Sequence, residues 1–147
     1  TGPGEYETKE VYVRGLETAT HYGGSAASRL NTIYYILVEG MHLCFLGALD
    51  SPQIGEKVHE AIHDVDVLFV PVGGGGSVGG VLAPAEAHKL ATKMEANIVI
   101  PMDYDDKTLK EFLKESGKNP KSEEKLTIKK KDLEGKTGEV VVLSAQS

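Results

Sequence analysis

The segment His59-Glu60-Ala61-Ile62-His63 has the pattern H-E-x-x-H, which can bind zinc when it lies on a helix. The two histidines would share the metal ion, and Glu60 would act as a general base in hydrolysis. The context disfavours this chemistry, because a strand pattern begins at Val65. The extended form of the motif would also need glycine and histidine where Asp66 and Phe69 stand. We therefore interpret the segment as part of a surface helix.

A second candidate site is the glycine-rich segment 73–80. Gly74, Gly76 and Gly79 satisfy G-x-G-x-x-G between a predicted strand and a predicted helix, and Asp103 follows the next strand. This order is typical of dinucleotide-binding folds, in which the glycines admit a pyrophosphate and the acid binds a ribose hydroxyl. Pro84 opposes this hypothesis, because it would lie inside a helix that began among the glycines. A glycine-rich loop at the mouth of the sheet is the simpler interpretation.

A third set of residues is dispersed along the chain. It consists of His21 in a predicted loop, the segment 47–50 (Gly-Ala-Leu-Asp) and the segment 101–104 (Pro-Met-Asp-Tyr). Each follows a predicted strand, so all three could converge on one edge of a sheet. Taken singly, a loop histidine and an aspartate at the end of a strand have ordinary structural explanations.

The first half of the chain predicts mainly strands. Residues 6–13 alternate between apolar and polar types, which indicates a half-buried strand. We interpret the small and polar residues 14–30 as a long loop. The runs 32–38 and 41–46 flank Glu39-Gly40 and predict a hairpin. Ser51-Pro52 is typical of a helix start, and the apolar residues at 54, 58, 61 and 62 predict one buried helix face.

The second half predicts strands that alternate with helices. Residues 65–72 form a nearly continuous apolar run, as in an interior strand, and 97–100 form another. One helix should begin at Ala83-Pro84, and a second should be capped by Asp106 and end at Gly117. Strands are predicted at 126–128 and 140–143. The lysines of 118–136 alternate with acidic residues and predict a solvated surface. The fold class is therefore α/β, or a layered α+β domain.

Composition excludes several classes of protein. The 147 residues, 40% of them hydrophobic, suit a single domain, residues 1–147, that needs no metal or disulfide to fold. One cysteine, Cys44, excludes a disulfide framework within the chain. A net charge of −6 disfavours nonspecific nucleic-acid binding. No apolar run approaches the length of a membrane helix and no signal-peptide pattern opens the sequence, so we expect a cytoplasmic protein without membrane association.

Taken together, the dispersed residues resemble a known family, the metal-dependent hydrolases of the metallo-β-lactamase fold, in its branch similar to L-ascorbate-6-phosphate lactonase. The resemblance covers nearly the whole sequence and corresponds to the C-terminal two-thirds of those proteins. It is carried by segments 2–7 (GPGEYE), 20–21 (TH), 31–34 (NTIY), 39–40 (EG), 46–47 (LG), 64–68 (DVDVL), 71–74 (PVGG), 98–102 (IVIPM) and 112–115 (FLKE).

The resemblance implies part of a four-layered αββα sandwich with a dinuclear zinc site at one edge of its sheets. A metal-bound hydroxide would there attack a lactone, an ester or a phosphodiester. His21 matches a loop histidine of the family that binds metal. Asp103 stands where the family has its last histidine, and a carboxylate can also bind zinc. These two residues are the predicted metal ligands.

Other positions depart from the family pattern. Ala48 stands where the family has a metal-bridging aspartate, and the main His-x-His-x-Asp-His cluster belongs to an N-terminal half that the sequence does not contain. Asp50 and Asp105 are only weak substitutes. A catalytic zinc needs about three protein ligands. We therefore expect the chain by itself to be inactive as a hydrolase.

Three hypotheses follow for the function. The chain is a hydrolase-type domain whose missing half supplies most ligands, or a non-catalytic binding or assembly module on the same scaffold, or a dinucleotide-binding domain through Gly74–Gly79. The start at Thr1 leaves open a truncated chain, a chain completed by a second polypeptide, and a protein without that half. Half a sandwich would expose Val67, Phe69, Ile98 and Ile100, so we predict self-association or a second chain. The small-molecule substrate is not predicted.

Overall fold

The computed structural model describes residues 4–8, 11–20, 29–49, 54–73, 81–118, 120, 122–123 and 128–143. The side chains of 4–8, 19–20 and 29–30 are not described. The elements, in chain order, are β1 (Gly4–Thr8), β2 (Val11–Thr20), β3 (Arg29–Val38), β4 (Met41–Phe45), α1 (Glu56–Ala61), β5 (Val67–Pro71), α2 (Pro84–Met94), β6 (Ile98–Met102), α3 (Asp106–Ser116), β7 (Ser122–Glu123), the short 3-10 helix η1 (Lys130–Leu133), β8 (Glu139–Val140) and β9 (Val142–Leu143).

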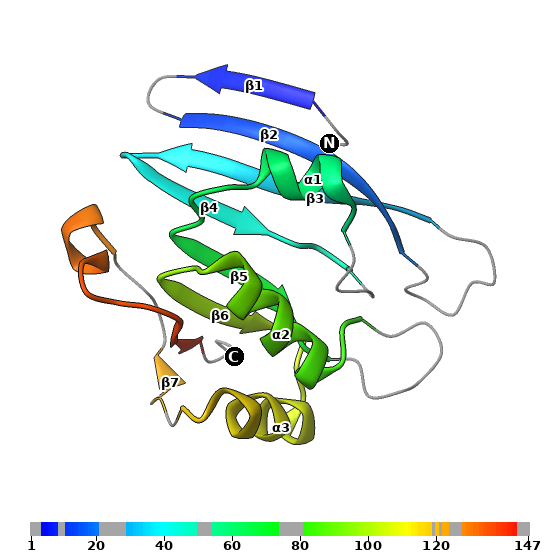
Figure 1. Ribbon diagram of the computed structural model, residues 1–147, viewed down its shortest axis with the longest axis vertical. Coiled ribbons are helices and arrows are strands. Elements are labelled where there is room, and N and C mark those ends of the chain that lie inside the picture. The colour runs from blue at the N-terminus through cyan, green and yellow to red at the C-terminus, as the bar shows by residue number, and fades with distance from the viewer. Residues whose placement is uncertain are drawn as a thin grey trace.

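One mixed sheet organises the part of the chain that the structure describes. Its strand order is β1-β2-β3-β4-β5-β6-β8, and β7 pairs separately with β9. The first four strands are antiparallel, whereas β4, β5, β6 and β8 run parallel. Figure 1 shows this sheet with the helices beside it. The α/β fold class predicted from the sequence is confirmed.

The predicted long loop over 14–30 is wrong for most of its length. β2 continues to Thr20 and β3 begins at Arg29, and the two strands pair over ten residues. Backbone pairing with a distant segment decides this stretch, because small residues have a weak strand preference of their own. The single strand predicted for 6–13 is in fact two strands, β1 and β2, which pair with each other.

The hairpin at Glu39-Gly40 is confirmed. Glu39 has φ 50° and Gly40 has φ 75°, and Val38 pairs with Met41 across the turn. Two positive φ angles at the centre of a two-residue turn match the twist of antiparallel strands. The turn fixes the register between β3 and β4.

All three α-helices contribute to a hydrophobic core on one face of the sheet. The buried members of this core include Leu68 and Val70 of β5, Leu90 of α2 and Phe112 of α3. α2 begins with Pro84, as predicted, and α3 ends at Gly117, whose φ is 69°. α1 begins at Glu56, later than the predicted start at 51–52, and residues 51–53 lie outside the described residues.

The opposite face of the sheet carries a second buried cluster, made of Met41, Val67, Ile98, Ile100 and Leu133. The predicted exposure of Val67, Ile98 and Ile100 is therefore wrong, since at most 2% of each is accessible. Leu133 of η1 packs with them, which means that part of the charged segment 118–136 covers this face. Phe69 is half-buried and stacks on Phe45.

The last predicted strands are only partly as expected. Strand pairing is found at 139–140 and 142–143, close to the predicted 140–143. Ile128 is not in a strand, and residues 126–127 lie outside the described part of the chain. None of the described helices is long and apolar enough to cross a membrane.

Candidate functional site at the carboxyl edge of the sheet

The parallel strands bring three chain segments to one edge of the sheet. Residues 46–49 follow β4, 72–73 follow β5 and 103–105 follow β6, and β5 lies between the other two strands. Neighbouring strands are about 4.8 Å apart, so the ends of β4 and β6 are separated by ~10 Å. Thr20 pairs with Arg29 at the same edge, because β3 runs antiparallel to β4. His21 and Asp50 themselves lie outside the described residues.

The turn after β4 is held by Asn31, a polar side chain with only 7% of its surface exposed. Its amide nitrogen donates to the carbonyl of Leu46 (2.9 Å) and to Oγ1 of Thr18 (3.2 Å). Its Oδ1 accepts from the backbone N–H of Ala48 (2.9 Å). Asn31 therefore fixes the backbone on both sides of Gly47. Leaving these buried groups without partners would cost ~1–3 kcal/mol each.

Gly47 is required by the same turn. Its φ is 66°, a conformation that costs other residues roughly 1–2 kcal/mol. A Cβ atom at this position would lie 2.5 Å from Oδ1 of Asn31 and 3.1 Å from the carbonyl oxygen of Thr32. The turn thus has a specific, tightly packed geometry, and it places residue 48 at the carboxyl edge. Residue 48 is alanine, whose side chain has no lone pair to offer a metal.

The turn after β6 places Asp103 at the same edge. Asp103 is exposed and has φ 54°. The backbone N–H of Val72 donates to the carbonyl of Met102 (3.0 Å), and a Cβ on Gly73 would overlap the carbonyl oxygen of Asp103. Only glycine lets the two segments approach this closely. Asp103 is therefore positioned by the beginning of the glycine-rich segment.

Asp105, the weak substitute ligand, serves another purpose. It is the N-cap of α3, and its Oδ1 accepts from the backbone N–H of Thr108 (2.8 Å). That hydrogen bond lowers the pKa of Asp105. The predicted cap at Asp106 is wrong by one residue, because Asp106 is already the first residue of the helix. The hydroxyl of Tyr104 donates to the carbonyl of Leu143 (2.6 Å), which holds this segment against the C-terminal strands.

The donor atoms at this edge do not fit a dinuclear metal centre as far as they are described. Asp103 is available, Asp105 is engaged as a cap, and Ala48 carries no donor in its side chain. Within the described ranges, no group of three or more His, Cys, Asp or Glu residues could hold a metal ion.

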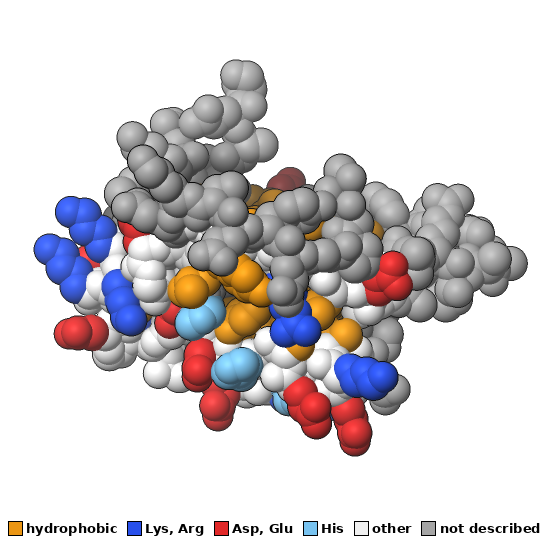
Figure 2. Space-filling model, turned by 90° about the horizontal axis from the view of Figure 1, so that it is seen from above, with side chains coloured by type: hydrophobic (Ala, Val, Ile, Leu, Met, Phe, Trp, Pro, Cys, Tyr) orange, Lys and Arg blue, Asp and Glu red, His pale blue; other side chains and the backbone are white. Residues whose placement is uncertain are grey.

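The H-E-x-x-H segment does not present its histidines as a pair. α1 ends at Ala61, and Ile62 is already extended, with φ −102° and ψ 96°. His59 therefore lies on the helix, whereas His63 lies beyond its end, and both are exposed. Figure 2 shows histidine side chains on the surface beside acidic and hydrophobic ones. The interpretation as a surface helix is confirmed for residues 56–61.

The opposite edge of the sheet carries another polar cluster. The ring of Tyr35 stacks on His42, with centroids 5.3 Å apart, and its hydroxyl donates to the carbonyl of His63. Burial, followed by the charge of Asp64, raises the pKa of Tyr35 to about 12. Oδ2 of Asp66 accepts from the backbone N–H of His42 (2.7 Å). These contacts tie β3 and β4 to the segment before β5, which is a structural role.

Gly74, Gly76 and Gly79 of the glycine motif lie outside the described residues. The dinucleotide-binding hypothesis can therefore be tested only on the neighbouring segments. α2 begins at Pro84, five positions after Gly79, with the backbone N–H of Ala83 donating to Oε1 of Glu86 (3.3 Å). In a dinucleotide-binding fold the helix would begin among the glycines. The start of α2 therefore disfavours that hypothesis.

Comparison with known proteins identifies the family. Residues 1–103 match the Beta-lactamase superfamily domain. The chain belongs to the beta-lactamase superfamily. No curated protein matches it significantly. The superfamily resemblance stated from the sequence is confirmed, whereas its lactonase-like branch remains a prediction.

Several solved structures share the fold of this chain. A candidate zinc-dependent hydrolase of the metallo-beta-lactamase superfamily from Thermotoga maritima is 28% identical, with a TM-score of 0.74 over 99% of this chain and 71% of that one. A candidate metal-dependent hydrolase from Parabacteroides distasonis is 15% identical, with a TM-score of 0.60 over 99% of this chain and 56% of that one. A diiron beta-hydroxylase from Streptomyces venezuelae is 15% identical, with a TM-score of 0.60 over 97% of this chain and 32% of that one. This chain therefore spans between a third and about 70% of these relatives.

Asn31 is the positioning residue that the sequence analysis missed. Its signal was a polar residue at the start of an apolar strand, where a buried side chain must find hydrogen-bond partners. The partners themselves, Thr18, Leu46 and Ala48, are distant in sequence and could not be recognised beforehand.

Proposed function

We propose that the chain is a hydrolase-like domain of the metallo-β-lactamase superfamily that does not form a catalytic metal centre by itself. The observation that carries this proposal is the turn at 46–48. Asn31 and Gly47 maintain the geometry that would position a ligand, while Ala48 supplies none. His21 and Asp103 are the remaining candidate ligands, and two ligands fall short of the three that a catalytic zinc needs.

The hydrolytic chemistry that the superfamily suggests is attack of water on a lactone, an ester or a phosphodiester, with the substrate polarised by metal ions. In this chain, Asp103 and His21 would each contribute one ligand to such a centre, and the other ligands would have to come from outside residues 1–147. The lactonase-like branch makes a lactone the first substrate to test.

A metal and activity measurement tests this proposal. The chain is purified, incubated with zinc or manganese and desalted, and its metal content is determined by mass spectrometry. We expect a content well below one ion per chain and no hydrolysis of γ-butyrolactone, p-nitrophenyl acetate or bis(p-nitrophenyl) phosphate above background. One tightly bound ion per chain that is lost in His21→Ala, together with turnover of any of these substrates, would overturn it.

The alternative function is a non-catalytic binding or assembly module on the same scaffold. The face of the sheet opposite the helices favours it, since Ile36, Leu43, Phe45 and Phe69 remain half-buried there although η1 covers part of that face. We propose that residues 1–147 fold as one domain and that a second chain or a second copy covers this face, because large apolar patches are rare on monomers. Sedimentation equilibrium is expected to give a dimer or larger species, and a monodisperse monomer would contradict it.

A further inference from the structure

A separate cavity lies at the opposite end of the parallel strands. It is open to solvent on one side, has a volume of about 340 Å³ and is lined by α2, the end of α3 and the beginnings of β6 and β8. This size is at the lower end of the range for small-molecule sites, roughly 300–1,000 Å³. Its position separates it from the carboxyl edge, where Ala48 and Asp103 lie.

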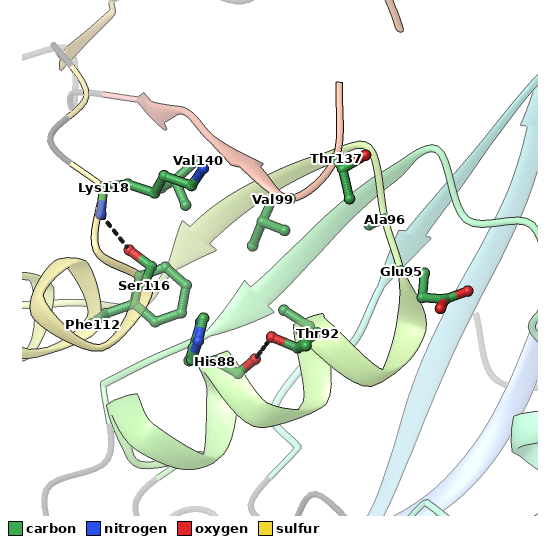
Figure 3. A pocket seen from close by; sticks show the side chains of 12 residues that line it. His88, Thr92, Glu95, Ala96, Val99, Phe112, Ser116, Lys118, Thr137 and Val140 are labelled. Carbon is green, nitrogen blue, oxygen red and sulfur yellow. Dashed lines mark hydrogen bonds between the residues drawn. The ribbon is translucent and has the colours of Figure 1, made fainter. Parts of the chain in front are cut away.

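The walls of the cavity are largely apolar. Buried side chains form the apolar part of its lining: Ala91, Ala96, Val99, Phe112 and Val140. The ring of Phe112 meets His88 edge to face, with centroids 6.3 Å apart and planes at 76°. Figure 3 shows these two rings next to each other at one side of the cavity. An aromatic or aliphatic group would fit between such walls.

The charged groups of the lining are arranged asymmetrically. Figure 3 shows the side chain of Lys118 reaching across the cavity towards Val140, whereas Glu95 points away from it. The hydroxyl of Thr92 donates its hydrogen bond within α2, to the carbonyl of His88 (2.9 Å). A single ammonium group over an apolar cavity is complementary to an anion with an apolar body.

The direction of Lys118 follows from the way that α3 ends. Gly117 adopts the left-handed conformation, and the backbone N–H of Lys118 donates to the carbonyl of Leu113 (3.3 Å) and to Oγ of Ser116 (3.3 Å). Oγ of Ser116 in turn donates to the carbonyl of Leu113 (2.9 Å). This C-terminal cap reverses the chain and fixes the backbone from which the lysine extends.

We propose that this cavity binds a small carboxylate with an aromatic or aliphatic body. The apolar body lies against Phe112, Val99 and Val140, and the carboxylate accepts a charge-assisted hydrogen bond from Nζ of Lys118. The site is a binding site distinct from the carboxyl edge, and it needs no metal. It does not depend on whether the chain hydrolyses anything.

Titration with 3-phenylpropionate tests the proposal by amide NMR, with 3-phenylpropanol as the uncharged analogue. We expect saturable shifts confined to residues 88–99, 112–118 and 137–140, and affinity for the alcohol about tenfold weaker, since hydrogen bonds to charged groups are the stronger ones. Lys118→Gln should weaken binding of the carboxylate about tenfold and leave binding of the alcohol unchanged. Lys110→Gln, an exposed change on α3 away from the cavity, should alter neither.

A second variant keeps the test independent of the charge. Thr92 is exposed, so Thr92→Tyr should fold normally while its ring obstructs the cavity and abolishes binding. The absence of saturable shifts at millimolar 3-phenylpropionate would overturn the proposal. Equal affinity of the native chain and Lys118→Gln for the carboxylate, or shifts at the carboxyl edge alone, would do the same.

Discussion

Two asparagines hold loops at opposite ends of the parallel strands. They differ in their burial and in the number of hydrogen bonds that they make. Asn31 is buried and makes three hydrogen bonds around the turn at 46–48. Asn97 is half-buried, and its Nδ2 donates to the carbonyls of Lys136 (2.9 Å) and Leu133 (3.4 Å). The backbone of the turn at the carboxyl edge is thus held in one specific geometry, as in a binding site, although the side chain of residue 48 supplies no ligand. At the amino edge, the asparagine beside the apolar cavity makes fewer and longer hydrogen bonds to its loop.

The largest expected effect is that of Gly73→Ala at the carboxyl edge. The new methyl group would overlap the carbonyl oxygen of Asp103, so the two segments must separate. We expect a loss of about 3 kcal/mol in the free energy of unfolding, in the range of severe steric mutations. Urea unfolding followed by circular dichroism measures it.

Gly117→Ala is the matched control for Gly73→Ala. Gly117 has φ 69°, and a Cβ atom added there would meet nothing within 4 Å, so its replacement introduces backbone strain without a clash. We expect a loss of about 1 kcal/mol there. If Gly73→Ala were no more destabilising than Gly117→Ala, the close contact between Gly73 and Asp103 would be refuted.

Asn31→Ala is expected to have the next largest effect. It removes three hydrogen bonds and leaves the carbonyl of Leu46 and the N–H of Ala48 without their partner. The expected loss is about 2 kcal/mol, by the same urea measurement. Hydrogen exchange at the amide of Ala48 should also accelerate. If the variant were as stable to urea as the native chain, Asn31 would not hold the turn.

Asn97→Ala is the corresponding change at the amino edge, and its effect on stability is compared with that of Asn31→Ala. Only two donated hydrogen bonds are lost, one of them long, and water can reach this half-buried group. We expect a loss of about 1 kcal/mol. A loss larger than that of Asn31→Ala would reverse the ranking of the two edges.

The smallest effect is expected from Asp105→Ala, and it should depend on pH. The N–H of Thr108 lowers the pKa of Asp105 below its ordinary value of 3.8, so the folded state favours the charged carboxylate. The stabilisation is therefore complete above the ordinary pKa and is lost as the pH falls through the lowered one. Thermal unfolding of both proteins should differ at pH 7 and converge in strong acid. A difference that grew on acidification would contradict the capping role.

The sequence predicted those elements whose signals are local. The apolar run of β5, proline at the first position of α2 and Gly117 after α3 each act within a few residues, and the structure confirms them. The strands over 14–20 and 29–30 were missed because their pairing partners decide them. The burial of Val67, Ile98 and Ile100 was missed because Leu133, which packs with them, lies in a stretch dominated by charge.

The position of the candidate site in the sheet could be predicted from the sequence. The hydrogen bonds that hold its residues could not. Parallel strand order brings Ala48 and Asp103 to one edge, as the sequence analysis expected for these segments. The capping role of Asp105 and the buried contacts of Asn31 depend on exact neighbours in space. Residues of the same types could serve either as ligands or as structural supports, and only their hydrogen bonds distinguish the two roles.

Zinc binding by Ala48→Asp tests the central claim most directly, namely that the turn still positions a ligand which the chain lacks. Isothermal titration compares the native chain with Ala48→Asp and with Ala48→Asn, which has a similar shape but no charge. We expect Ala48→Asp to bind one zinc ion at least about tenfold more tightly than the other two proteins. Indistinguishable zinc binding by all three, or a tightly held ion in the native chain, would contradict the account.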